Sequence, residues 1–277
     1  MAAPARSTAA SARSATAPQP GDDLGLLRLL QLGDSGFPSG AYTLSHGLET
    51  LVADGLLRGG DALPGLIKVH LLARFARSDL VSLIAAHDAA RGAAAHDAAH
   101  DAARGAAAHV ADAPHAARVA DADQRIISID RRLTACKLAA DERLGSERVG
   151  RRLAVEVSRL MPADRIVAFL AAVEAGEAPG NAAIAFGLAG QALGIDRRRT
   201  ALAAASAQVM GLVAAAVRLG LIGHGAGQQC IAGAAPLIVA AVDLASSRDW
   251  RDLRPSAPQL DIALARHERA PARSFVS

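Results

Sequence analysis

The amino-acid sequence predicts an all-α protein, organised as a single helical-bundle-like domain of about ten helices. Aromatic residues make up only 3% of the 277 residues and alanine is abundant, which favours closely packed helices over a β-sandwich rich in Val, Tyr and Trp. Apolar residues recur at spacings of three and four along most of the chain, as they do on one face of a helix. We therefore expect helix crossings rich in Ala and Gly.

Residues 1–23 are predicted to form a disordered N-terminal tail, ahead of one domain over residues 24–277. They are mainly Ala, Ser, Thr, Pro and Arg, without the apolar core of a secretory signal. A transit peptide has a similar composition, since arginine is present and no acidic residue precedes Asp22, but so does a disordered tail. We favour the disordered tail.

The overall charge and the cysteine content narrow the classes of function. The net charge is +3 and both signs are mixed along the chain, whereas a nucleic-acid-binding protein is expected to have one strongly basic face. The two cysteines, Cys136 and Cys230, are far apart, so no disulfide framework or zinc knuckle is expected. A reducing cytoplasm is the simpler location.

The segment from Leu24 to Leu51 carries the most informative pattern. An apolar run of leucines ends at Gly33, and residues 34–40 are turn formers that cannot continue a helix. Ser39 can cap a helix that begins near Ala41. That helix is predicted to present one apolar face and one polar face. The polar face contains Tyr42, Ser45, His46 and Glu49.

Residues 51–85 are also predicted to be helical, with a break at Gly59-Gly60. The next helix begins near Asp61 and carries a broad apolar stripe with basic flanks, which continues past Asp79.

An almost exact tandem repeat then interrupts the pattern. Residues 86–98 recur at 99–111, with Val110 in place of Asp97, and two short copies are too few for a solenoid. We interpret residues from about 86 to 120 as a low-complexity insert, either an Ala-rich helix or a disordered loop. The alternative is a metal site, but only His96 and His100 stand four apart on one helix face, and no third ligand lies beside them. The remaining histidines of the repeat are His87 and His109.

Regular apolar spacing returns at Asp123 and predicts one long amphipathic helix to Leu144, followed by a second stripe that ends before Pro162. The outer face of the first helix would carry many charges, most of which we expect to be solvated. These are Asp130, Arg131, Arg132, Lys137, Asp141, Glu142 and Arg143.

Two helical pieces follow, separated by a Gly/Pro break at residues 176–180. The run at 200–217 is nearly long enough to span a membrane, but polar residues interrupt it, so we expect a buried central helix. Small residues at 220–227 allow close backbone approach, as at a seam between subunits. The final long helix is predicted over 230–245, with a kink at Pro236.

The C-terminal residues, from about 248 to 277, are predicted to be a mobile tail. Six arginines and few apolar residues follow Ser247, so this segment cannot bury much surface. Its aromatic and guanidinium groups are of the kinds that anchor interfaces. The candidate anchors are Arg266, His267, Glu268, Arg273 and Phe275.

Three blocks of sequence resemble the UreF family of urease accessory proteins. The first is the opening segment, with Asp-Ser-Gly-Phe-Pro-Ser-Gly-Ala-Tyr at 34–42 and Ser-His-Gly-Leu-Glu at 45–49. The second is a middle block from Asp130 to Leu153, and the third is the C-terminal segment with Arg-His-Glu at 266–268. Together they span most of the chain outside residues 1–23 and 86–120. The departures from the family pattern are Asn181, His224, Ala272 and Ser274.

The resemblance implies a chaperone for nickel insertion into urease. Such a protein would be a cytoplasmic homodimer that bridges the UreG-type GTPase and the UreD/UreH-type accessory protein for the urease apoprotein. Nickel would be the cargo of the pathway, and no tightly bound cofactor, nucleic acid or membrane is expected. The expected partner-binding residues are Tyr42, His46, Glu49, Arg266, His267, Glu268, Arg273 and Phe275.

The sequence offers little support for an enzyme. It contains no G-x-S-x-G elbow, no P-loop and no H-E-x-x-H, and the adjacent Ser45 and His46 would point about a hundred degrees apart on a helix. The remaining alternative is a helical metal carrier or enzyme that uses the His/Asp-rich repeat. Nickel-binding calorimetry on the isolated chain would separate a carrier from a scaffold.

Overall fold

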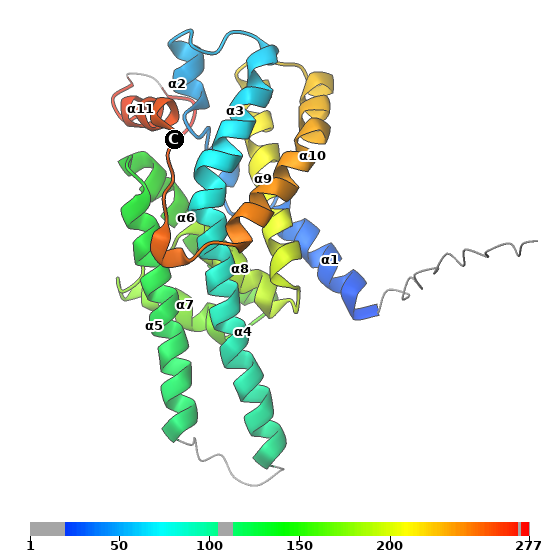
Figure 1. Ribbon diagram of the computed structural model, residues 1–277, viewed down its shortest axis with the longest axis vertical. Helices are drawn as coiled ribbons and strands as arrows, with labels where there is room; N and C mark the ends of the chain where they lie inside the picture. The colour runs from blue at the N-terminus through cyan, green and yellow to red at the C-terminus, as the bar shows by residue number, and fades with distance from the viewer. Residues whose placement is uncertain (1–19, 105–112, 271–272, 277) are drawn as a thin grey trace, which may run out of the picture.

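The prediction of an all-α domain of about ten helices is confirmed. The computed structural model describes residues 20–104, 113–270 and 273–276, and in this part of the chain it contains eleven α-helices and no strand (Figure 1). The expected disordered tail lies almost wholly outside the described residues. The helices are α1 (Pro20–Gly33), α2 (Leu48–Ala53), α3 (Leu63–Val69), α4 (Asp79–Arg104), α5 (Ala113–Cys136), α6 (Ala140–Leu160), α7 (Asp164–Glu174), α8 (Ala182–Ala192), α9 (Arg197–Arg218), α10 (His224–Ser246) and α11 (Pro258–His267).

Helix α8 forms the centre of the domain. It packs against α4, α6, α7 and α9, and every residue from Ala183 to Gly190 is buried. A helix that is apolar on all sides belongs in a core. Gly187 permits the close crossing with α4, because an added Cβ would lie 2.5 Å from the Leu83 carbonyl oxygen.

Helices α9 and α10 pack against each other on one side of the domain. Both are long and apolar enough to cross a membrane by length and composition alone. Half of the most apolar window of α9 is buried inside the domain, as expected for a core helix, but only 28% of that of α10 is buried. Pro236 lies inside α10. The outer face of α10 is therefore the more exposed apolar surface of the two.

The prediction of one helix from Ala41 onwards is wrong. A short 3₁₀ helix, η1 (Ala41–Thr43), is separated from α2 by residues in the left-handed region, His46 at φ 52° and Gly47 at φ 84°. A right-handed helix cannot pass through such residues. Ser39 Oγ still accepts a hydrogen bond from Ala41 N at 3.4 Å, although Gly40 occupies the N-cap position.

The single helix predicted over 123–144 is also wrong, because it breaks between α5 and α6 at residues 137–139. At the break, the Lys137 side chain turns inward and its Nζ lies 2.7 Å from Asp79 Oδ1. Asp130, placed on the solvated face from sequence, is 0% exposed. The helical repeat of 3.6 residues predicts which side chains are buried only where the helix is continuous and no other element covers its outer face.

The described part of the repeat lies in α4, one of two helical arms. Helix α4 continues through the first copy to Arg104 and α5 begins at Ala113, and the two arms extend together beyond the rest of the domain (Figure 1). An Ala-rich helix is thus confirmed for residues 86–104. The side chains of residues 93–115 lie outside the described part, and His96, His100 and His109 are among them.

The expectation that the C-terminal residues bury little surface is wrong. Leu253, Leu260, Leu264 and Phe275 are all less than a tenth exposed, and α11 packs against α2 and α6. The mobility expected for this segment stays a prediction.

Candidate functional site

The beginning and the end of the domain meet at one surface. Helix α2 lies beside α11 at the upper end of the molecule in Figure 1, close to the C-terminus. The residues that follow α11, here called the C-terminal segment (residues 273–276), return to η1 and α2, where Val276 N donates to the Thr43 carbonyl at 2.8 Å. Two sequence blocks more than 200 positions apart therefore build the same surface.

Glu49, on α2, accepts three hydrogen bonds from this end of the chain. The donors are His267 Nε2 at 2.9 Å, Ser274 N at 2.7 Å and Phe275 N at 3.2 Å. Burial by itself raises the pKa of Glu49, but these hydrogen bonds outweigh burial and leave the pKa below its ordinary value. One carboxylate thus joins α2, α11 and the C-terminal segment.

His267 lies between two carboxylates and is only 1% exposed. Its Nε2 faces Glu49, and its Nδ1 lies 3.2 Å from Asp141 Oδ2 on α6. Arg273 Nη1 donates to the same Asp141 oxygen at 2.8 Å. Asp141, expected from sequence to be solvated, is therefore a second junction between the core and the C-terminal segment.

The Phe275 ring is buried beneath Arg218 of α9. The guanidinium carbon lies 4.3 Å from the ring centroid, a distance at which a cation and an aromatic face attract each other. Arg218 also donates a hydrogen bond to the Tyr42 carbonyl. Arg218 therefore connects the C-terminal segment with η1.

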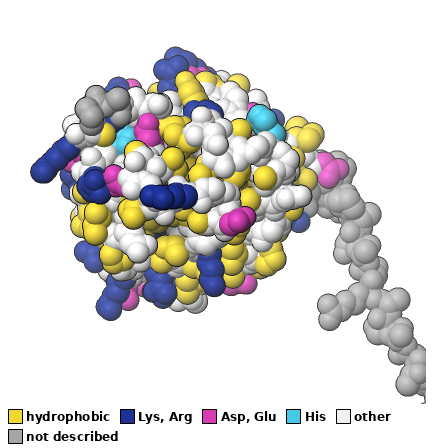
Figure 2. All heavy atoms as spheres, turned by 90° about the horizontal axis from the view of Figure 1, so that it is seen from above, with side chains coloured by type: hydrophobic (Ala, Val, Ile, Leu, Met, Phe, Trp, Pro, Cys, Tyr) yellow, Lys and Arg dark blue, Asp and Glu magenta, His cyan; other side chains and the backbone are white. Residues whose placement is uncertain are grey.

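The eight predicted partner-binding residues fall into two groups. Tyr42 is 58% exposed, the side chains of Arg266 and Arg273 are 59% and 40% exposed, and Glu268 is exposed. His267 and Phe275 are buried, while Glu49 and His46 are partly buried. Seen from above, Lys and Arg side chains surround this end of the molecule, with apolar side chains between them (Figure 2).

Two exposed residues of the first group, Arg266 and Glu268, make contacts with α2 and α6 beside this surface. Arg266 Nη1 lies 2.6 Å from Asp54 Oδ2 at the end of α2, and the Glu268 carboxylate accepts a hydrogen bond from Ala140 N at the start of α6. The structure thus unites seven of the eight residues at this surface. His46 is the exception.

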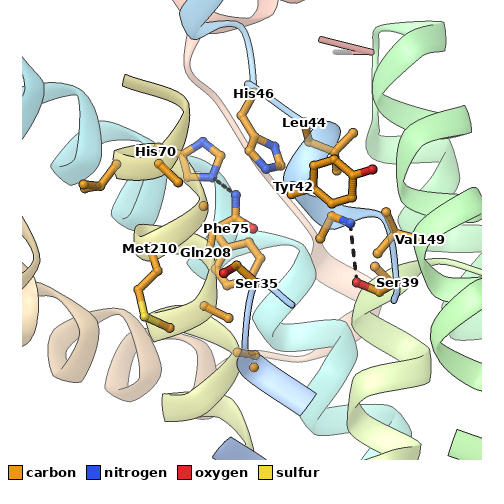
Figure 3. Close-up of a pocket in the computed structure, with 18 of the residues that line it drawn as sticks. Ser35, Ser39, Tyr42, Leu44, His46, His70, Phe75, Val149, Gln208 and Met210 are labelled. Atoms are coloured by element: carbon orange, nitrogen blue, oxygen red, sulfur yellow. Dashed lines mark hydrogen bonds between the residues drawn. The ribbon is translucent and has the colours of Figure 1, made fainter. Parts of the chain in front are cut away.

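His46 points instead into a cavity of about 520 Å³ behind the surface (Figure 3). Its ring centroid lies 5.3 Å from that of His70, and the amide of Gln208 donates to His70 Nε2 at 2.9 Å. Burial lowers the pKa of His46, and with the added effect of the nearby Lys137 and Arg74 the pKa is about 4. Burial also lowers the pKa of His70. Both imidazoles are therefore neutral at neutral pH.

Four charged residues that line the cavity form ion pairs that the sequence did not indicate. Arg74 bridges Glu142, at 2.6 Å, and Asp261 on α11. Lys137 pairs with Asp79, and this contact outweighs the effect of burial to lower the pKa of Asp79. Through Arg74, these charges fix the positions of α6 and α11 beneath the surface.

Asn181, where the sequence departs from the family pattern, has a clear structural role. It is completely buried, and its side-chain amide donates to Asp130 Oδ1 at 2.7 Å and to Thr134 Oγ1 at 2.6 Å. Ser146 Oγ donates to Asn181 Oδ1 at 2.9 Å. The amide thus joins α5, α6 and the start of α8, in a role that helical periodicity could not reveal.

The described side chains offer no group of three or more His, Cys, Asp or Glu that could hold a metal ion. Of the histidines of the repeat, His87 is described, and it is buried with Nε2 2.7 Å from the Ile195 carbonyl oxygen. The other three lie outside the described side chains, so the reading of the repeat as a metal site stays a hypothesis.

Comparisons with known proteins agree with the resemblance in sequence. The UreF family model matches residues 57–235. The chain is 27% identical over 252 residues to a urease accessory protein UreF of Bacillus sp. (strain TB-90), covering 91% of this chain and 99% of the relative. It is 29% identical to that of Lachnoclostridium phytofermentans, with 91% and 98% covered. A urease accessory protein UreF 1 of Brucella melitensis is 28% identical over 256 residues, with 91% and 93% covered.

Proposed function

Because this chain belongs to the UreF family of urease accessory proteins, we propose that it acts as a non-enzymatic scaffold for insertion of nickel into urease. In this role it binds a UreD-type accessory protein and a UreG-type GTPase, and it presents both to the urease apoprotein. Nickel is the cargo of the pathway, and the assembly works in the cytoplasm as a dimer of this chain.

The observation that supports the proposal most directly is that the opening and C-terminal blocks share one surface. The exposed side chains of Tyr42, Arg266 and Arg273 surround two buried groups, the Phe275 ring and the His267 imidazole. Exposed aromatic and arginine side chains around a shielded centre are typical of protein interfaces. Tyr42 and Arg273 are connected through Arg218 and Phe275. A partner that displaces or extends the C-terminal segment would also contact η1 and α2.

The two partners use different parts of this surface. Arg273 and Phe275 belong to the segment that returns to the core, so we assign them to the UreD-type protein. Tyr42 stands out from η1 and is assigned to the UreG-type GTPase, which joins after the first partner. The link through Arg218 supports this order, because repositioning the C-terminal segment would change the surroundings of Tyr42.

The dimer is assigned to the outer face of α9 and α10. No charged residue occurs in α10 before Asp243, and its exposed residues include Ala232, Gly233, Ala235 and Val239. An uncharged stripe of small residues permits two copies of the helix to approach closely.

Reconstituted activation of urease tests the proposal. The purified chain is combined with the UreD-type protein, the UreG-type GTPase, GTP, nickel and urease apoprotein, and urease activity is measured. Arg273→Ala should reduce activation, since it removes the guanidinium group that is assigned to the UreD-type protein. Arg159→Ala is the matched control, because Arg159 is an exposed arginine at the opposite end of α6 from Asp141. Equal activation by both variants would contradict the proposal.

A further inference from the structure

The exposed charges on helix α6 are all positive. Its acidic residues are partly buried, and two of them, Asp141 and Glu142, are occupied by contacts to His267, Arg273 and Arg74. Its exposed residues are arginines and leucines, namely Leu144, Arg148, Arg151, Arg152, Arg159 and Leu160. The outer face of α6 therefore offers solvent only guanidinium and apolar groups.

The first half of this outer face is held in a fixed orientation. An added Cβ at Gly150 would lie 2.1 Å from the Gly180 carbonyl oxygen, so the inner side of α6 packs directly against the backbone that precedes α8. The helix cannot rotate there without a clash. Leu144, Arg148 and Arg151, at spacings of four and three, lie on one side of a helix. These three residues are here called the α6 platform.

The α6 platform adjoins the surface at which the two ends of the domain meet. Arg148 Nη2 donates to Thr43 Oγ1 at 2.9 Å, and the carbonyl of the same threonine accepts from a backbone N–H of the C-terminal segment. One helical turn before Leu144, Asp141 accepts from Arg273. The Leu144 residue itself is 61% exposed. The platform thus extends the surface formed by η1, α2 and the C-terminal segment.

The two guanidinium groups of the platform lack a balancing carboxylate. Within the described part of the chain, Arg148 bonds to a neutral hydroxyl, and Arg151 has no hydrogen bond or ion pair. Arg152 and Arg159, further along α6, differ because both lie beside Glu156, at 3.5 and 3.3 Å. Unbalanced arginines favour a partner that carries carboxylates, because guanidinium and carboxylate groups form two parallel hydrogen bonds.

We propose that the α6 platform binds an acidic segment of the UreD-type protein, with carboxylates on Arg148 and Arg151 and an apolar side chain on Leu144. This assignment rests on the function proposed above, in which Arg273 and Phe275 contact the same partner. A protein segment fits the platform better than a nucleic acid, because a nucleic acid requires a wider basic face than three residues of one helix. The platform gives the partner a fixed attachment beside the C-terminal segment.

Charge complementarity of this kind acts mainly on the rate of association. Opposite charges attract the two proteins before they touch, and dissolved salt screens exposed charges from each other. The contribution of the platform is therefore greatest at low salt. Loss of the Arg148–Thr43 hydrogen bond alone would not produce this dependence on salt.

Biolayer interferometry between the full-length chain and the purified UreD-type protein measures this contribution. Arg148→Glu combined with Arg151→Glu should weaken binding about tenfold or more at about 0.05 M sodium chloride, and the loss should shrink at about 0.5 M. Arg118→Glu combined with Arg125→Glu is the matched control, because both arginines are exposed on α5 and the change in net charge is the same. The control should bind as the parent chain does.

If the double platform variant fails to fold by circular dichroism, Arg151→Glu alone decides the question. Arg151 makes no contact that the change could break, so a salt-dependent loss of binding would come from its charge. A folded platform variant that binds as the parent does would overturn this proposal while the proposed function stands. Equal losses in the platform and control variants would do the same.

Two further outcomes separate the alternatives. A parent chain that does not bind the UreD-type protein would contradict the proposed function, and this assignment with it. Duplex DNA is titrated in parallel as the alternative ligand. A platform variant that loses binding to DNA but keeps its full affinity for the UreD-type protein would overturn the proposal in favour of a nucleic-acid site.

Discussion

At the scale of single residues, buried polar contacts determine how the surface is positioned, and these were the hardest features to predict from sequence. Asp130 and Lys137 fall at outward positions of a regular helical pattern, yet both are buried. Their positions depend on partners distant in sequence, Asn181 and Asp79. No local pattern encodes such contacts. Tyr42, Arg266 and Arg273 were predicted correctly as exposed groups, because residue type alone favours that placement.

Asp130 offers the first prediction. Its carboxylate accepts from Gly180 N at 2.6 Å and from the backbone and side chain of Asn181. In Asp130→Asn, the new side-chain amide N–H groups would face the N–H groups of Gly180 and Asn181. The free energy of unfolding should therefore fall by about 1–3 kcal/mol. Asp121→Asn, at an exposed position of the same helix, should change it little. The measurement is urea denaturation, and equal effects of the two changes would show that the Asp130 contacts do not support the fold.

His46 gives a prediction about pH. Its pKa is about 4 in the folded protein against an ordinary 6.5, so the unfolded chain binds the proton more readily. Stability is therefore fully present above about pH 6.5 and declines as pH falls toward 4. His46→Asn should reduce this decline, by no more than about 3 kcal/mol, and asparagine tolerates the left-handed backbone at this position.

The check on His46 is the denaturation midpoint at several pH values between 7 and 4.5. His224→Asn, at an exposed histidine, is the control and should decline as the parent protein does. Some decline should remain in His46→Asn, because His70 also has a lowered pKa. A variant with the full decline of the parent protein would contradict the assignment to His46.

At the scale of helices, the sequence predicted most of the elements but not where two of them end. Apolar spacing identified α7, α8 and α9 and the break between α7 and α8. It failed at residues 137–139 and at residues 44–47, where the chain turns without a proline to signal it. At the second site the turn depends on the left-handed backbone of His46 and Gly47. Only tertiary packing stabilises that conformation for a histidine.

The repeat leads to a prediction about the arms of α4 and α5. Residues 99–104 lie at the end of α4, where it extends beyond the core, so removal of residues 99–111 should leave the core packing intact. We expect far-ultraviolet circular dichroism and reconstituted urease activation to stay near the parent level. Loss of activation by a folded deletion variant would show that the His/Asp-rich repeat has a function of its own.

Gly223 tests the assignment of the dimer face. It is exposed at the start of α10, and nothing lies within 4 Å of an added Cβ, so a larger side chain is tolerated within one copy. In a dimer, Gly223→Leu should overpack the seam, cost about 1–3 kcal/mol and shift the protein toward monomer or aggregate in light scattering. Gly92→Leu on α4, equally open, should not. An unchanged dimer in Gly223→Leu would place the interface elsewhere.

At the scale of the whole molecule, the central feature is the return of the chain's end to its opening segment. The sequence indicated that both segments were chemically suited to contact partners, but not that they contact each other. That information lies in hydrogen bonds such as Glu49 to Ser274 and in the burial of Phe275. The family resemblance supplied a proposed function for the two segments, and the structure adds that they meet at one surface through Glu49 and Arg218.

Capture of partners by a truncated chain tests this account most directly. The truncation ends after Ala270, because α11 buries Leu264 and His267 and should stay intact. In a pull-down with purified proteins, the truncated chain should remain a folded dimer that no longer captures the UreD-type protein. Tyr42→Ala should still capture it but recruit the UreG-type GTPase more weakly, by about 2 kcal/mol or more. A truncated chain that assembles the full complex and activates urease normally would contradict the account.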